Sequence, residues 1–310
     1  MIEAVNLTKT FKQVKAIDNV NLYIEPGEIV GLLGPNGAGK STTIALLSTL
    51  IEPTAGDVLF RQQSVIQNPK LLREVLGVVP QEIALYWELT ARENLQFFGS
   101  LQKIPQSELK ARIDTVLQQI GLEDELKKPV KYYSGGMRRR LNIGASLLHK
   151  PAYLIMDEPT VGIDPQSRSY ILQAIKKLNQ EENTAIIYTS HYMEEVEFLC
   201  DRLYIMDKGK IIAAGTKEEI KAILSAEKTI EMKLEKHSKP FADALIAQGL
   251  LANIQVAEAH ISFTVGKNVD FLPLILPLCE AHQVVLKSFQ MKEPTLEDVF
   301  LHLTGRALRD

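Results

Sequence analysis

The sequence predicts an α/β fold built around a phosphate-binding P-loop, and three observations lead to this prediction. Residues 34–42, GPNGAGKST, fit the pattern G-x-x-x-x-G-K-[ST]. An apolar run at residues 28–33 precedes this loop and a helical pattern follows it from Thr42, which is the strand–turn–helix context that the motif requires. Later apolar runs end in polar side chains, as parallel strands do at a ligand site; these runs are residues 76–81, 152–158 and 184–191.

The composition limits the classes of protein to which the chain can belong. Its length of 310 residues predicts two domains, and its net charge of −3 gives no broad basic surface for nucleic acid. Cys200 and Cys279 lack metal-ligand spacing, so we expect reduced thiols in a cytosolic protein. We expect no signal peptide and no membrane span, because no basic-then-apolar start and no run of 18 apolar residues is present.

The P-loop is preceded by a predicted β layer. Residues 2–33 alternate apolar and polar positions and contain a turn at residues 25–28, which indicates antiparallel strands that lead into the loop. Phe11 lies in this layer, and two interpretations of it stay open: a stacking platform for an adenine ring, or an ordinary half-buried side chain.

The P-loop residues suit phosphate binding. The glycines let the backbone curl so that successive N–H groups point at phosphate oxygens, and the helix N-terminus adds partial positive charge. We expect Lys40 to reach the β- and γ-phosphates and the Ser41 hydroxyl to hold Mg²⁺. The predicted nucleotide-binding residues here are Gly34, Asn36, Gly37, Ala38, Gly39, Lys40, Ser41 and Thr42.

From about residue 90 to residue 150 the pattern is helical. Thr90 and Glu93 fit a capping box, and a second helix is predicted at residues 107–120. Ser134 is the expected N-cap of a further helix, and with Gly135 and Gly136 it forms a second potential anion site. We interpret the arginines at residues 138–140 as the solvated face of this helix rather than as a nucleic-acid patch.

Polar side chains follow the predicted strands where each strand ends. Asp157 follows a buried strand beside the P-loop, where Mg²⁺ needs a ligand, and is expected to serve the metal through water. Glu158 is placed to orient and polarise an attacking water. Gln81 and His191 end two further strands, so we predict that both belong to the same site.

The rest of the chain completes one domain and forms another. A β-hairpin at residues 201–212 and a helix from Lys217 to about Ala226 are expected to close a first domain of residues 1–226. Residues 227–310 follow a β-α-β-α-β-α pattern without a titratable cluster. The expected strands are residues 230–234, 261–265 and 284–286, and the expected helices are at about residues 240–249, 269–282 and 295–303. We interpret this small domain as a docking or dimerisation domain rather than as a second active site.

In order and spacing, these motifs resemble the ATP-binding subunit of an ABC transporter. The resemblance covers about residues 1–220 and rests on residues 34–42, Gln81, residues 133–137, residues 154–158, Asp164 and His191. The Ser-Gly-Gly signature separates this family from kinases, small GTPases and RecA-like motors, which share only the P-loop. The chain departs from the commonest signature, Leu-Ser-Gly-Gly-Gln, at Tyr133 and Met137, which leaves the Ser-Gly-Gly core intact.

Shorter strings resemble the ABC-2 type exporters, the daunorubicin-resistance-like group. They are MRRRL at 137–141, TVGIDP at 160–165, HYMEE at 191–195, PTLEDVFL at 294–301 and LTGR at 303–306. The resemblance implies a P-loop NTPase with a RecA-like core, an antiparallel β subdomain, a helical subdomain at about residues 82–150 and a small C-terminal α+β domain.

The resemblance also implies roles within one subunit. Phe11 stacks on adenine, and Gln81 senses Mg²⁺ and signals to a permease. Glu158 is the catalytic base, and His191 contacts the γ-phosphate. ATP and Mg²⁺ are the implied cofactors, and the residues implied to bind the metal are Ser41, Gln81 and Asp157.

Further implied roles concern partners. Ser134, Gly135 and Gly136 bind the γ-phosphate that the other subunit of a homodimer holds, and Asp164 couples the two sites. The family pairs such a chain with a separate transmembrane permease, so the implied location is cytoplasmic, on the inner face of the cell membrane. The substrate is selected by the permease.

Two other functions are alternatives to the exporter. A soluble ABC ATPase acting on DNA or ribosomes would carry an inserted coiled coil, a second ATPase domain or a basic surface, and the sequence has none of these. A non-catalytic binding module is disfavoured because Lys40, Asp157, Glu158 and His191 are intact. For Trp87, a permease contact and a core position are equally open.

Overall fold

The computed structural model describes most of the chain. The described residues are 1–125, 127–224, 227–247, 249, 251–266, 269–292 and 294–305. Three details of the predictions lie outside them: the end of the helix expected to reach Ala226, Gln248 in the helix expected at 240–249, and Arg306 in the family-like tail. Among the described residues, no helix is both long and apolar enough to cross a membrane.

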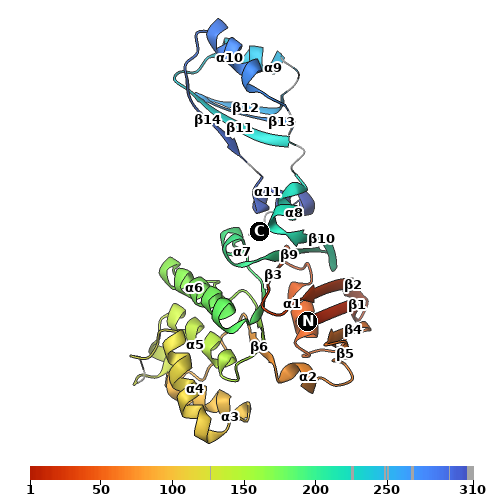
Figure 1. Cartoon of the computed structure of the whole chain (residues 1–310), viewed down its shortest axis with the longest axis vertical. Coiled ribbons are helices and arrows are strands. Elements are labelled where there is room, and N and C mark those ends of the chain that lie inside the picture. Colours follow the sequence, from red (N-terminus) through yellow and green to blue (C-terminus); the bar gives the residue numbers. More distant parts are fainter. Residues whose placement is uncertain are drawn as a thin grey trace. The chain divides into compact units, whose positions relative to one another are not determined.

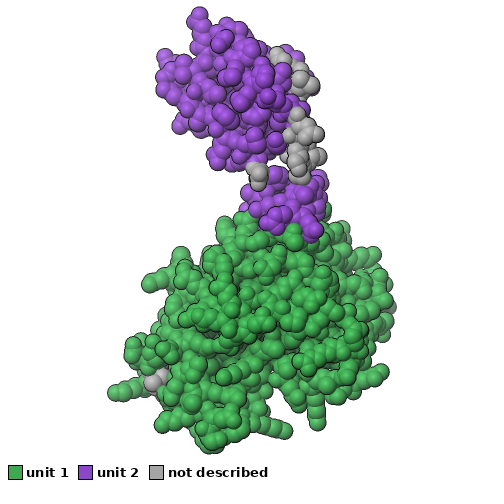
Figure 2. All heavy atoms as spheres, in the orientation of Figure 1, with its two compact units in different colours: residues 1–217, 303–310 green, residues 218–302 purple. Residues whose placement is uncertain are grey.

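The chain divides into two compact units, which Figure 2 shows in different colours. Unit 1 comprises residues 1–217 and 303–310, and unit 2 comprises residues 218–302. The expected boundary between residues 226 and 227 stays a prediction, because Ala226 is outside the described residues. Each unit has a hydrophobic core of its own.

The centre of unit 1 is a six-stranded sheet with the order β10-β9-β3-β8-β7-β6. Its strands are β3 (Ile29–Leu33), β6 (Leu76–Val79), β7 (Tyr153–Met156), β8 (Ala185–Tyr188), β9 (Arg202–Asp207) and β10 (Lys210–Thr216). The pairings β9–β3, β3–β8, β8–β7 and β7–β6 are parallel, and β9 and β10 form the predicted antiparallel hairpin. Every residue of β3, β7 and β8 is buried, as expected for parallel strands covered on both faces.

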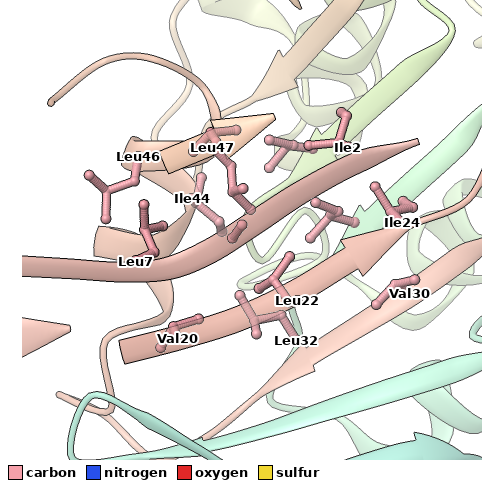
Figure 3. Packing of buried hydrophobic residues seen from close by; sticks show 14 of the residues in the cluster. Ile2, Leu7, Val20, Leu22, Ile24, Val30, Leu32, Ile44, Leu46 and Leu47 are labelled. Carbon is pink, nitrogen blue, oxygen red and sulfur yellow. The ribbon is translucent and has the colours of Figure 1, made fainter. Parts of the chain in front are cut away.

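A second sheet confirms the predicted β layer and extends it. Its order is β2-β1-β4-β5, with β1 (Ile2–Phe11), β2 (Val14–Ile24), β4 (Ala55–Phe60) and β5 (Gln63–Ser64). The apolar positions of β1 and β2 are buried against β3 and against α1 (Lys40–Leu47), and Figure 3 shows these side chains meeting. This packing fixes the P-loop, which lies between β3 and α1, on both of its flanks.

Two helices of unit 1, α3 (Ala91–Leu101) and α5 (Gly135–Leu147), begin at the predicted caps. Apart from α1, the other helices of this unit are α2 (Lys70–Arg73), α4 (Gln106–Gln119), the 3-10 helix η1 (Val130–Tyr132), α6 (Pro165–Glu182) and α7 (Met193–Leu199). Thr90 and Glu93 form the expected capping box of α3, and Ser134 caps α5 by accepting a hydrogen bond from the Met137 N–H. Figure 1 shows α5 among α3, α4 and α6, whereas α1 lies beside β1, β2 and β4.

The C-terminal part departs from the predicted order of elements. Its elements are α8 (Lys217–Ala222), β11 (Glu227–Leu234), α9 (Lys239–Ala247), β12 (Ala252–Ala257), β13 (His260–Gly266), α10 (Leu272–Ala281), β14 (Leu286–Lys292) and α11 (Leu296–Thr304). The sheet has the order β12-β13-β11-β14, with every pairing antiparallel. The β-α-β-α-β-α pattern was wrong because it omitted β12, which lacks a strong apolar alternation, and placed the last strand at residues 284–286.

Candidate nucleotide-binding and catalytic site

The predicted site residues follow four neighbouring parallel strands. Gly34 follows β3, Gln81 follows β6, Asp157 and Glu158 follow β7, and His191 follows β8 within three residues of its end. Because β3, β8, β7 and β6 are adjacent and parallel, their carboxyl ends lie along the same edge of the sheet. The fold therefore brings these polar side chains to one place.

The P-loop backbone curls in the way that the motif predicts. Gly37 and Gly39 have φ angles of +80° and +107°, in the left-handed region that favours glycine. A Cβ atom added to Gly37 would meet no heavy atom within 4 Å, so the space beside this part of the loop is open. The Lys40 ammonium, on a side chain only 6% exposed, donates hydrogen bonds to the carbonyls of Gly34 at 2.7 Å and Pro35 at 3.2 Å.

The charge of Lys40 is balanced by the two acids. Burial lowers the pKa of Lys40, and the nearby carboxylates of Glu158 and Asp157 oppose that shift. Burial raises the pKa of Asp157, while a hydrogen bond from the Thr189 hydroxyl lowers it. The loop thus presents an amine to the carboxylates, in a region that suits the phosphates of a nucleotide and a divalent cation.

The oxygen donors near the loop fit Mg²⁺. The predicted ligands offer the Ser41 hydroxyl, the Asp157 carboxylate and the Gln81 amide oxygen, which are the hard donors that this ion prefers. The described residues contain no cluster of three His, Cys, Asp or Glu that could hold a metal ion by itself.

Glu158 is held from three sides. Its Oε2 accepts a hydrogen bond from Gln81 Nε2 at 2.9 Å, its Oε1 lies 2.5 Å from His191 Nε2, and its N–H donates to Thr189 Oγ1 at 2.8 Å. The backbone is left-handed, with φ +47°, a conformation that a non-glycine residue keeps only where its surroundings impose it. The hydrogen bond to His191 lowers the pKa of Glu158 against the effect of burial. The result is an ionised carboxylate with a fixed orientation.

Thr189 is a site residue that the sequence analysis did not identify. It is fully buried, and its hydroxyl joins the two acids, because it donates to Asp157 Oδ1 at 2.8 Å and accepts from the Glu158 N–H. The available signal was its position directly after β8, beside the strand that ends in the acids.

The Ser-Gly-Gly segment packs against the start of another helix. A Cβ atom added to Gly135 would meet nothing within 4 Å, whereas one added to Gly136 would overlap the Ser167 side chain. Asp164 caps α6 by accepting a hydrogen bond from the Ser167 N–H at 2.9 Å, and this bond lowers the pKa of Asp164. The helix starts that carry Ser134 and Asp164 are therefore packed together, and one face at Gly135 is open.

The three arginines after the signature are not the solvated face that we predicted. Arg139 is 6% exposed and donates to the Gln81 carbonyl at 2.7 Å, so it ties α5 to the Gln81 segment. Arg138 stacks 4.8 Å from the Trp87 ring, and Arg140 donates to the carbonyl of Ile120. The prediction was wrong because long side chains reach carbonyls and rings that a helical pattern does not reveal.

Three aromatic residues of interest lie at the surface. Phe11, at the end of β1, is 48% exposed, which leaves its adenine-stacking role a prediction. Tyr86 and Trp87 are 49% and 45% exposed. The core interpretation of Trp87 is therefore wrong, and an exposed aromatic pair follows the Gln81 segment.

Comparison with known proteins gives the same assignment as the motifs. The family model described as ABC transporter matches residues 17–161. The chain is 43% identical to the linearmycin resistance ATP-binding protein of Bacillus subtilis (strain 168), over 100% of both chains. It is 33% identical to the daunorubicin/doxorubicin resistance ATP-binding protein of Streptomyces peucetius, over 100% of this chain and 94% of that protein.

A solved structure gives a matching fold. It is the dimeric ATP-binding cassette MJ0796 in a post-hydrolysis state, bound to ADP and Pi, with a TM-score of 0.64 and 28% sequence identity. The match covers 70% of this chain and 98% of that one. The likeness therefore spans a complete cassette and leaves nearly a third of this chain beyond it.

Proposed function

Because this chain belongs to the ATP-binding subunits of ABC transporters, we propose that it powers an ABC-2 type exporter through ATP-driven dimerisation. The chain is an ATPase. The observation that carries the proposal is the arrangement at the sheet edge, where Gln81 and His191 hold the Glu158 carboxylate at the same edge at which the strand before the P-loop ends.

In this proposal each chain supplies most of the hydrolytic machinery from the sheet edge. Glu158 accepts the proton of the attacking water, and its low pKa keeps it ionised for that task. Lys40 exchanges its hydrogen bonds to the loop carbonyls for phosphate oxygens, and His191 orients Glu158 and contacts the γ-phosphate. Mg²⁺, held by Ser41, Gln81 and Asp157, would neutralise charge on the phosphates.

We infer that the remaining contacts come from a second copy of the chain. The P-loop is fixed between β3 and α1, whereas Ser134 and Gly135 start α5, which lies among the other helices (Figure 1). Hydrolysis needs charge stabilisation from several sides of the γ-phosphate. In a head-to-tail homodimer, each open Ser-Gly-Gly helix start meets the ATP of the partner, so ATP binding closes the pair and hydrolysis opens it.

The test of a shared site uses two inactive variants. Lys40→Ala disables the P-loop and Ser134→Arg blocks the signature, so in a mixed dimer one site carries both lesions and the other carries neither. In an equimolar mixture with random pairing we expect about a quarter of the wild-type ATPase rate. The control is each variant alone, which should show background hydrolysis only.

Tethering the two variants in one polypeptide raises the fraction of mixed pairs and should raise the recovered rate. If a tether of the two variants stays inactive while a wild-type tether is active, the sites are not independent units shared across the dimer. ATPase activity of the wild-type chain would still stand in that case.

We propose that the partner in the membrane is a separate ABC-2 type permease, which places the chain on the cytoplasmic face of the membrane. Two observations support this partner. The chain matches two drug-resistance ATP-binding proteins over nearly their whole length, and the Tyr86–Trp87 pair is exposed beside the Gln81 segment. The alternative, a soluble ABC ATPase acting on DNA or ribosomes, is not favoured.

Co-purification from membranes tests the permease directly. A tagged chain should bring down a polytopic membrane protein, and Trp87→Ala should weaken that association at least tenfold while basal ATPase activity is kept. Tyr132→Ala removes another exposed aromatic ring and serves as the control. Equal recovery of the membrane protein by wild type and Trp87→Ala would remove Trp87 from the contact.

A further inference from the structure

We propose that Glu195, a buried acid of α7, is a positioning residue that holds the His191 segment and the Glu158 segment in their working arrangement. The proposal rests on the proposed ATPase function and names a part of its machinery that no motif assigns. Glu195 is 2% exposed, although glutamate is among the residue types most rarely buried. A buried acid of this kind needs compensating partners, and its partners are informative.

Three hydroxyl groups converge on one oxygen of this carboxylate. Glu195 Oε2 accepts hydrogen bonds from Thr160 Oγ1 at 2.8 Å, Tyr188 Oη at 2.8 Å and Ser190 Oγ at 2.6 Å. Burial and the neighbouring carboxylate raise the pKa of Tyr188 well above its ordinary value, so the phenol stays protonated and donates. The three donors fix the acid, and the acid fixes the two segments that carry them, one at Thr160 and one from Tyr188 to Ser190.

The other oxygen faces a cation on a different helix. Glu195 Oε1 lies 3.5 Å from Arg168 Nε, an ionic contact longer than a good hydrogen bond. Arg168 belongs to α6, and its guanidinium lies 3.9 Å from the centre of the Tyr192 ring. The Ser190 hydroxyl also accepts a hydrogen bond from the Tyr192 N–H at 2.9 Å. The backbone on both sides of His191 is therefore tied to this cluster.

The sequence positions of these partners point to the catalytic pair. Thr160 lies two residues after Glu158, and Ser190 lies directly before His191. The 2.5 Å contact between Glu158 and His191 thus joins two segments, and each of these segments also donates a hydrogen bond to the Glu195 carboxylate. Arg168 extends the cluster to the first turns of α6, the helix that Asp164 caps. One buried carboxylate consequently contacts the Glu158 segment, the His191 segment and the start of α6.

An amide cannot replace this carboxylate without conflict. In Glu195→Gln one side-chain position becomes an NH₂ donor, which must face either the three hydroxyl donors or the Arg168 cation. Either orientation loosens one of the anchored segments. Because the P-loop takes no part in the cluster, we expect kcat to fall about tenfold to a hundredfold, with the Kd for ATP changed less than about twofold.

The experiment compares full-length wild type, Glu195→Gln and Glu194→Gln in the same preparation. Glu194 is the neighbouring, exposed acid of α7, so its variant has the same charge change without the buried cluster and should keep the wild-type kcat. Turnover is normalised to the concentration of sites that bind a non-hydrolysable ATP analogue. If kcat per binding-competent site is unchanged in Glu195→Gln, the residue stabilises the fold only and the proposal is overturned.

A double-mutant cycle separates positioning from general destabilisation. In a His191→Ala background, Glu195→Gln should lower kcat by a smaller factor than it does in wild type, because the part of its effect that acts through the His191 segment is already lost. If the reduction of kcat in the double variant equals the product of the reductions in the two single variants, the proposal is overturned. Should Glu195→Gln not fold, Thr160→Val removes a single donor and is expected to lower kcat about threefold to tenfold, and an unchanged rate would count against the proposal.

Wild-type activity keeps this test distinct from the proposed function. Hydrolysis by the wild-type chain with an unaffected Glu195→Gln refutes only the positioning role. A wild-type chain without any ATPase activity refutes the proposed function instead.

Discussion

The two units of the chain use β-sheets in opposite ways. In unit 1, β3, β8, β7 and β6 are parallel neighbours, so their carboxyl ends meet at one edge, and Glu158 there is 7% exposed and bonded to Gln81 and His191. In unit 2 every strand pairing is antiparallel, so successive strand ends lie at opposite edges.

Charged residues show the same contrast. The ion pairs of the unit 2 sheet, Lys292–Glu231 at 2.7 Å and Lys287–Glu235 at 3.0 Å, join side chains that are 44–53% exposed. Such pairs contribute little to stability and create no unusual chemistry. The parallel strands of unit 1 bring buried ionisable side chains together, so that these side chains shift each other's pKa values. The antiparallel sheet of unit 2 instead has its charged side chains spread over the surface. We therefore expect turnover to depend on single atoms at the edge in unit 1 and to be insensitive to unit 2.

The largest expected effect is that of removing the charge from Glu158. Glu158→Gln keeps the shape of the side chain but removes the proton acceptor, so ATP hydrolysis should fall about a hundredfold to ten-thousandfold. ATP should still bind, because Lys40 and the P-loop are untouched. Size-exclusion chromatography with ATP and Mg²⁺ should then show an ATP-bound dimer, since the closed state is no longer hydrolysed.

The corresponding acid in unit 2 provides the control for this comparison. Glu231→Gln removes a half-buried carboxylate from β11 and should leave the ATPase rate at the wild-type level. Near wild-type hydrolysis by Glu158→Gln would show that another group is the base, and would break the contrast between the two sheets.

The residues at the sheet edge could be predicted from the sequence for a physical reason. A buried parallel strand is a continuous apolar run, so a polar side chain at its end is conspicuous, and the P-loop identifies the edge to which the ends point. The capping residues Thr90 and Ser134 could be predicted as well, because a cap is a local interaction.

The interactions that join distant segments could not be predicted. Thr189 contacts Glu158 from 31 positions away in the chain and Glu195 contacts Thr160 from 35 positions away, and no local pattern specifies such a partner. Helical spacing does place Glu195 four residues before the buried Leu199, which is the one signal that could have indicated a buried acid. In unit 2, β12 and β14 were missed or misplaced because exposed edge strands carry a weak apolar pattern.

A smaller effect is expected on the pH dependence of catalysis. The hydrogen bond from His191 lowers the pKa of Glu158 below its ordinary value of 4.5, whereas burial raises it. In His191→Ala the raising effect remains, so Glu158 takes up its proton at a higher pH and the acid limb of the kcat–pH profile should move to higher pH. The profile is measured with ATP at saturation from pH 4 upward.

The same shift has a consequence for stability. A carboxyl group whose pKa is lower in the folded chain adds stability above its ordinary pKa and loses it as the pH falls through the folded value. His191→Ala should therefore be less stable than wild type near neutral pH and closer to it in strong acid. His260→Ala, which removes an exposed histidine of β13 in unit 2, is the control and should leave the acid limb in place. An unmoved limb in His191→Ala would separate His191 from the ionisation of Glu158.

The smallest expected effect on turnover is that of damage to the core of unit 2. Phe263 is 1% exposed, and its ring centre lies 6.3 Å from that of Phe271. Phe263→Ala should cost unit 2 about 3–5 kcal/mol of folding free energy, through lost burial and the cavity that remains. If the two units have separate roles, kcat for ATP should change less than about twofold, because none of the residues at the sheet edge belongs to unit 2.

The matched variant in unit 1 is Leu32→Ala, which removes a side chain that is 1% exposed from the strand directly before the P-loop. A similar loss of free energy there should move the P-loop and abolish ATP binding. Calorimetry with and without an ATP analogue distinguishes the two cases, because a ligand raises the melting temperature only of the part that binds it. In Phe263→Ala the early transition should be insensitive to the analogue and the later one should rise with its concentration. Phe263→Ala could instead show a single unfolding transition that shifts with the analogue, together with a loss of turnover. That result would mean that unit 2 supports the folding of the ATPase, and that the contrast between the units is structural rather than functional.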